Sequence, residues 1–146
     1  MGKEAKGFDL YNELPKKYIM KNGAVYPKGV LFLLDKYEVE AIYCRGNLNA
    51  LLNEVAKGRP VTVLIKTFEN KNWLHYSTVV GYDREYIYLA ESYKPLINCN
   101  EDDYNKENYN RRISKEEFKK LWNTRQLKMP LYKNTFYRIK ENKLCE

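Results

Sequence analysis

The sequence has 146 residues, of which 44% are hydrophobic and 31% charged, and its formal net charge is +7. This balance is typical of a globular domain and argues against an intrinsically disordered chain. No apolar run approaches the roughly 20 residues of a membrane helix, and residues 1–8 hold no signal-peptide core. We therefore expect one soluble domain over residues 1–146 that does not enter a membrane. It is cytoplasmic as written, or extracellular or in the cell envelope if Met1 is not the natural start.

The basic charge and the fourteen tyrosines leave a small nucleic-acid-binding protein as an alternative. The lysines are scattered, however, and no run of five basic residues occurs. The three cysteines, Cys44, Cys99 and Cys145, are widely spaced, which is typical of neither a disulfide framework nor a zinc site. With one histidine in the chain, we expect no metal or other cofactor.

The first half of the chain has helical periodicity. Residues 8–19 predict a short amphipathic helix interrupted near Pro15, and Pro27 suits the first turn of a second helix. Residues 38–43 alternate as a strand does. Asn47 is a good N-cap for a third helix, which Gly58 closes.

The second half has the period of two that strands show. Residues 59–68 predict a central strand, and residues 73–82 and 85–91 a hairpin that turns near Asp83 and Arg84. A polar loop over residues 92–112 follows. Ser114 and Glu117 form a capping box that opens a helix, and residues 135–139 could add a last strand. Helices first, then an antiparallel β-sheet with a late helix, indicate an α+β fold.

His75 is the first candidate for chemistry, because imidazole changes charge near neutral pH. It shares one face of its strand with Ser77 and Val79. The hairpin brings Glu91 back opposite residues 75–77, within one register step. A carboxylate there would orient the imidazole and fix its tautomer. A surface histidine beside an unrelated acid is the alternative.

Several motifs, taken in order, resemble C39-like peptidases, which are papain-like cysteine peptidases related to the bacteriocin-processing peptidases. These motifs are a Gly-Pro-Val strand, a His strand that ends in Gly-Tyr-Asp, an acidic residue after the returning strand, and a Phe…Trp helix. In this chain they are Gly58, Pro60, Val61, His75, Gly81, Tyr82, Asp83, Glu91, Phe118 and Trp122. The resemblance implies a papain-like fold, with His75 as general base and Glu91 as the orienting acid in place of the family's usual Asp.

The resemblance also implies a nucleophilic cysteine at a helix N-terminus, with a Gln a few residues upstream, both of which would precede residue 1. The cysteines present are weak substitutes for this nucleophile: Cys44 in a turn, Cys99 in the long loop and Cys145 next to the chain end. We therefore expect a domain incomplete at its N-terminus that keeps the His/acid dyad and is inactive alone. Copies could associate over the place of the missing helix.

Two other hypotheses remain. A pseudopeptidase would bind a peptide or partner protein in the vestigial cleft, lined by Trp73, His75, Ser77, Tyr93 and the long loop. An active enzyme would use Cys44 or Cys99.

Overall fold

The computed structural model describes residues 7–71, 73–99, 108–124 and 132–140. The chain forms two compact units, one of Met1–Tyr43 with Ile139–Glu146 and the other of Cys44–Arg138. That the whole chain is a single domain stays a prediction. No helix in the described ranges is long and apolar enough to cross a membrane.

The first unit begins with short helices. Helix α1 spans Gly7–Asn12, the 3-10 helix η1 spans Lys16–Tyr18, and α2 spans Pro27–Lys36 with its proline in the first turn. Pro15 has an extended backbone and caps η1, so the helix expected over residues 8–19 is two separate pieces.

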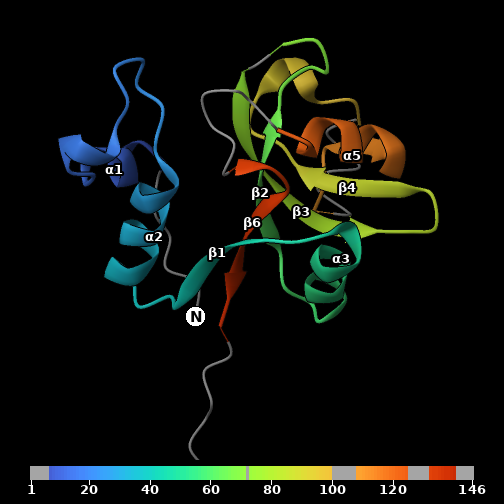
Figure 1. Cartoon of the computed structure of the whole chain (residues 1–146), viewed down its shortest axis with the longest axis horizontal. Helices are drawn as coiled ribbons and strands as arrows, with labels where there is room; N and C mark the ends of the chain where they lie inside the picture. Colours follow the sequence, from blue (N-terminus) through green and yellow to red (C-terminus); the bar gives the residue numbers. More distant parts are fainter. Residues whose placement is uncertain (1–6, 72, 100–107, 125–131, 141–146) are drawn as a thin grey trace, which may run out of the picture. The chain divides into compact units, whose positions relative to one another are not determined.

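A six-stranded sheet has the order β1-β6-β2-β3-β4-β5 (Figure 1). Pairing is antiparallel from β6 through β2, β3 and β4 to β5. The strands are β1 Ala41–Arg45, β2 Val61–Lys66, β3 Leu74–Tyr82, β4 Tyr86–Ala90, β5 Arg111–Ser114 and β6 Thr135–Ile139. Helices and an antiparallel sheet in this order confirm the α+β class.

Two helices of the second unit pack on one face of this sheet. Helix α3, Leu48–Ala56, begins at Asn47, whose Oδ1 accepts a hydrogen bond from the Ala50 amide at 2.9 Å. Helix α5, Lys115–Trp122, begins at Ser114, whose Oγ accepts one from the Glu117 amide at 3.1 Å. Both N-caps were predicted. The core joins these helices to alternate strand residues, namely Leu51, Leu52, Val55, Val61, Val63, Ile65, Val79, Ile87, Leu89, Ile113, Phe118, Leu121, Trp122 and Phe136.

Two expectations for the connecting segments were wrong in detail. The strand expected over residues 38–43 is shifted, because Glu38 adopts a left-handed backbone with φ of 60° and β1 begins only at Ala41. The segment expected to be a loop to residue 112 contains the 3-10 helix η2, Lys94–Leu96, and ends in strand β5. Strand β5 pairs with β4 and buries Arg111 and Ile113.

Candidate active site

The hairpin of β3 and β4 decides which side chains meet His75. Thr78 pairs with Ala90 and Val79 with Leu89, and a β-bulge lies between Val79 and Gly81. Continuing this register by one residue places Glu91 opposite Ser77, diagonal to His75 on the core face. The predicted approach of Glu91 to the imidazole is therefore what the hairpin produces.

Glu91 is the centre of a buried polar cluster. Its Oε1 is hydrogen-bonded to Nε2 of His75 and accepts a second bond from the Tyr93 amide at 2.9 Å. Its Oε2 accepts a bond from Nη1 of Arg111 at 3.0 Å. The side chains of Glu91 and Arg111 are 0% and 4% exposed, whereas that of His75 is 19% exposed. The Glu91 carboxylate is thus shielded from solvent, whereas the His75 imidazole is partly exposed to solvent.

Charge pairing in this cluster outweighs burial. Burial alone would raise the pKa of the Glu91 carboxyl. The hydrogen bond to His75, the Tyr93 amide, the charge of His75 and the bond from Arg111 instead hold that pKa below its ordinary value. Glu91 is therefore a carboxylate at neutral pH, which can accept an N–H bond from the ring. Because Nε2 of His75 is bonded to this carboxylate, Nδ1 is the ring nitrogen that can accept a proton.

Asn110 fixes the backbone of Glu91 just beyond the end of β4. Its Oδ1 accepts a hydrogen bond from the Glu91 amide at 2.7 Å, and its Nδ2 donates one to the Glu91 carbonyl at 2.9 Å. One side chain therefore continues the pairing that β5 gives to β4. The roles of Asn110 and Arg111 were not predicted from the sequence. The available signal was the spacing of Arg111 and Ile113, two positions apart, which suits one face of a strand.

The model of the Peptidase_C39 like family matches residues 8–127 of this sequence. The chain belongs to that family. The structure of a presumed C39-like peptidase from Bacillus anthracis is similar to it, with a TM-score of 0.52 at 19% sequence identity. That likeness covers 81% of this chain and 60% of the other, and it shows a shared fold. No curated protein matches the sequence.

The residues proposed to line the cleft of this C39-like chain differ in exposure. Trp73 is 63% and Tyr93 39% exposed, and the Tyr93 ring lies 6.1 Å from that of His75. Ser77 is only 3% exposed, and its Oγ makes no hydrogen bond to the described residues. The partly exposed Tyr93 ring therefore lies near the imidazole, whereas the Ser77 hydroxyl is buried on the core face of the sheet.

Neither described cysteine lies beside His75. Cys44 is in β1, three strands from β3 in the sheet order, or about 14 Å at ordinary strand spacing. Burial raises the pKa of its thiol, Arg138 lowers it and Glu54 raises it, with a net increase. The Cys99 amide bonds the Asn110 carbonyl at 3.2 Å, which places Cys99 on the β5 side of β4. Cys145 lies outside the described residues.

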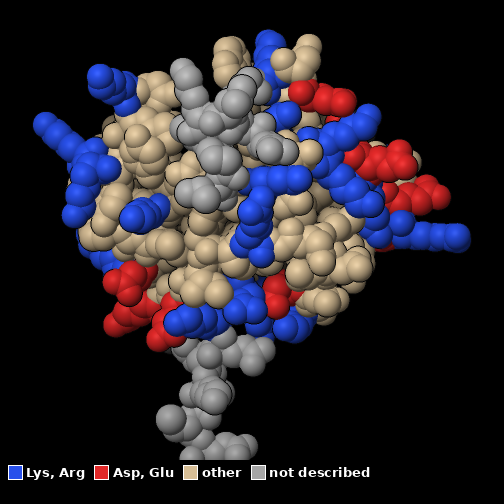
Figure 2. Space-filling view, in the orientation of Figure 1, with Lys and Arg blue, Asp and Glu red and all other residues tan. Residues whose placement is uncertain are grey.

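The remaining candidate ligand groups do not gather. No set of three or more His, Cys, Asp or Glu side chains in the described ranges could hold a metal ion. On the face in Figure 2, Lys and Arg side chains are spread out and acidic side chains lie among them. That face offers no continuous basic track.

Proposed function

We propose that this chain supplies the histidine–carboxylate half of a C39-like cysteine peptidase site and does not cleave peptides by itself. The observation that carries the proposal is the hydrogen bond between His75 and a buried Glu91. In this role Glu91 holds Nε2 protonated, so that Nδ1 acts as the general base toward a thiol. Arg111 is a positioning residue that keeps Glu91 ionised and in place.

The proposed lack of turnover rests on the described thiols. A histidine can activate a cysteine thiol as a nucleophile only when the two side chains lie within hydrogen-bond distance. Cys44 is separated from His75 by strands β6 and β2, and Cys99 is held against residue 110 on the far side of β4. The raised pKa of the Cys44 thiol also makes it a poor nucleophile at neutral pH.

The test is thiol labelling with an epoxide peptidase probe, read site by site by mass spectrometry, together with hydrolysis of fluorogenic peptides. We expect no hydrolysis and equal labelling of Cys44 and Cys99 in the native chain and in His75→Ala. Tyr76→Phe, the next residue on the opposite face of β3, is the control for folding effects of a substitution there. If any cysteine were labelled in the native chain but not in His75→Ala, the proposal that the chain is inactive would be wrong.

A second candidate function is peptide binding without cleavage, favoured by the exposed Tyr93 ring near His75 and by the exposed Trp73, which precedes His75 by two residues in the sequence. Of the two tryptophans, Trp73 is 63% exposed and Trp122 only 2%. Quenching of tryptophan fluorescence by acrylamide therefore reports on Trp73. A pool of synthetic extended decapeptides that binds along this surface would reduce quenching, and Trp73→Phe would remove the response. No protection at millimolar peptide would reject this function while leaving the dyad proposal standing.

A further inference from the structure

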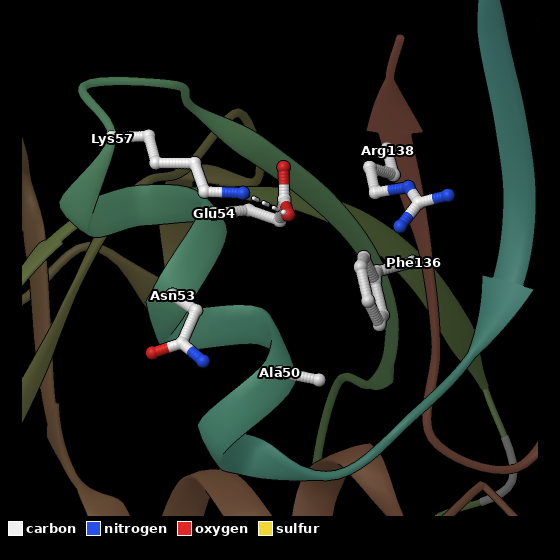
Figure 3. Close-up of a pocket in the computed structure, with 6 residues that line it drawn as sticks. All are labelled: Ala50, Asn53, Glu54, Lys57, Phe136 and Arg138. Atoms are coloured by element: carbon white, nitrogen blue, oxygen red, sulfur yellow. Dashed lines mark hydrogen bonds and ion pairs between the residues drawn. The ribbon is translucent and has the colours of Figure 1, made fainter.

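A pocket of about 400 Å³ lies between α3 and β6 (Figure 3). Continuing the antiparallel pairing of Val63 with Phe136 places Arg138 beside Val61. His75 pairs with Ile65, four residues farther along β2. The pocket is therefore at the opposite end of the sheet's core face from the dyad. It is lined by Ala50, Asn53, Glu54, Lys57, Phe136 and Arg138.

One wall carries a carboxylate that is already neutralised. The Glu54 side chain is 10% exposed and forms ion pairs with Nζ of Lys57 at 3.1 Å and with Nη1 of Arg59 at 3.3 Å. Two cations thus share a single buried anion. Lys57 is itself half exposed at 49%, so its ammonium group can contact a ligand as well as Glu54.

The other wall carries Arg138, which faces the Glu54 carboxylate across the pocket without an ion pair to it among the described contacts. Figure 3 shows the Arg138 guanidinium on the β6 side of the pocket and the Lys57–Glu54 pair on the α3 side. Arg138 forms no ion pair with the described residues, and its side chain is exposed. Among the residues that line the pocket, Lys57 and Arg138 stand against Glu54, so the formal charge of the lining is 2 − 1 = +1. The net charge of the pocket lining is therefore positive.

The floor between the walls is apolar and rigid. It consists of the Phe136 ring and the Ala50 methyl group. A Cβ atom at Gly46 would come within 2.8 Å of Cε1 of Phe136, so this glycine lets the ring pack directly against the backbone. Phe136 belongs to the core cluster, and Ala50 packs against that cluster. The aliphatic stems of Lys57 and Arg138 add further apolar surface.

We propose that this pocket binds a carboxylate that carries an apolar or aromatic group. The guanidinium of Arg138 binds the carboxylate through two N–H donors, and Lys57 adds a second cation. The apolar group lies over Phe136 and Ala50. The volume suits a small molecule or the last residue of a peptide, since both present the same chemistry.

The experiment titrates the full ¹⁵N-labelled chain with N-acetylphenylalanine and follows the backbone amide signals of the lining residues. N-acetylphenylalaninamide has nearly the same shape and no charge. We expect the acid to shift these signals and the amide to bind at least about tenfold more weakly, the factor for a charge-assisted hydrogen bond. Equal affinity for acid and amide would overturn the proposal.

Two variants test the cation. Arg138→Gln should weaken N-acetylphenylalanine binding about tenfold without lowering the melting temperature, because the side chain is exposed. Arg84→Gln removes the same charge from an exposed turn outside the pocket and should leave binding unchanged. Unchanged binding of N-acetylphenylalanine to Arg138→Gln would overturn the proposal. The proposal would also be wrong if tens of millimolar N-acetylphenylalanine did not shift the pocket signals of the native chain.

A third probe separates the two sources of the carboxylate. If 3-phenylpropionate binds as tightly as N-acetylphenylalanine, a free aromatic acid suffices. If it binds much more weakly, the pocket recognises a peptide C-terminus, because only the peptide-like probe carries an amide that Asn53 could bond. His75→Ala should leave all three titrations unchanged, which keeps this test separate from the function of the dyad.

Discussion

Arg111 and Glu91 form an ion pair that is almost closed to solvent, with 3.0 Å between Nη1 and Oε2 and side-chain exposures of 4% and 0%. The two residues come from β5 and from the end of β4, so the pair also ties these neighbouring strands together. A charge buried in this way depends on its partner far more than a surface charge does.

Replacing Arg111 by Met should destabilise the fold by about 3 kcal/mol, because a buried carboxylate loses its permanent cation. The estimate is at the low end of the range for such pairs, since His75 and the Tyr93 amide still bond Glu91. Urea unfolding measures it. Arg112→Met is the matched control, as Arg112 lies over the Tyr86 ring on the exposed face. Equal losses in the two variants would argue against the buried pair.

Acid should destabilise the native chain more than it destabilises Glu91→Gln. The pKa of Glu91 in the folded chain lies below its usual value of 4.5. Its carboxylate therefore contributes fully to stability above pH 4.5, and this contribution is lost as the pH falls through the lower, folded pKa. Melting temperatures between about pH 7 and pH 3 test this. Asp83 also has a lowered pKa but is common to both proteins, so parallel curves would contradict the assignment to Glu91.

Asn110→Ala should cost about 1–3 kcal/mol, because the amide and carbonyl of Glu91 each lose their partner. It should also loosen the dyad. The ring N–H proton of His75 is a suitable reporter, since the chain has one histidine and the signal is unambiguous. We expect that proton to exchange faster with water in the variant. An unchanged exchange rate would mean that Asn110 supports the backbone without positioning the carboxylate.

Ser77→Ala should be neutral or stabilise the fold by up to about 1 kcal/mol. The Ser77 hydroxyl is buried and has no hydrogen-bond partner in the described part of the chain, so removing it ends a desolvation cost. The neighbouring Thr78→Ala should instead destabilise, because Thr78 Oγ1 bonds Thr62 Oγ1 at 3.2 Å. A clear loss of stability in Ser77→Ala would show that the hydroxyl has a partner of its own, such as a bound water.

Binding to single-stranded DNA should be weak despite the net charge of +7. On the face in Figure 2, basic side chains are spread out and groups of acidic side chains lie among them, so few phosphates could be contacted together on that face. We expect a shallow dependence of binding on salt in fluorescence anisotropy titrations. A slope of several units in log K against log salt would restore the nucleic-acid alternative.

Local patterns were enough to predict most of the second unit. The caps at Asn47 and Ser114 satisfy helix N–H groups through short-range bonds, which a sequence displays directly. Strand β6 was predicted with the bounds the structure has, and the hairpin of β3 and β4 was predicted to within a residue or two at its ends.

The support for the dyad could not be predicted, because its residues are far from Glu91 along the chain. Arg111 bonds Glu91 across a separation of 20 residues, and Asn110 across 19. Strand β5, which carries Arg111, has only four residues, two of them charged, and lacks the apolar alternation of an obvious strand. Only the pairing of β5 with β4 shows that Arg111 faces the core.

Glu91 lies on the same face as His75 only in one register of β3 and β4, and the bulge between Val79 and Gly81 shifts that register by one residue. If β3 and β4 paired regularly from the turn, with Val80 opposite Leu89 and no bulge, Glu91 would stand opposite Thr78, and its side chain would leave the face that carries His75. Insertions at the tip of the hairpin, around Asp83 and Arg84, should therefore be harmless to the dyad. Deletion of Val80 should close the bulge and keep Ser77 opposite Glu91, whereas deletion of one residue between Tyr88 and Glu91 should move Glu91 by one register step and abolish the dyad. Among relatives of this chain, length changes in this hairpin should accordingly accumulate at the turn and be rare in β4 between Tyr88 and Glu91.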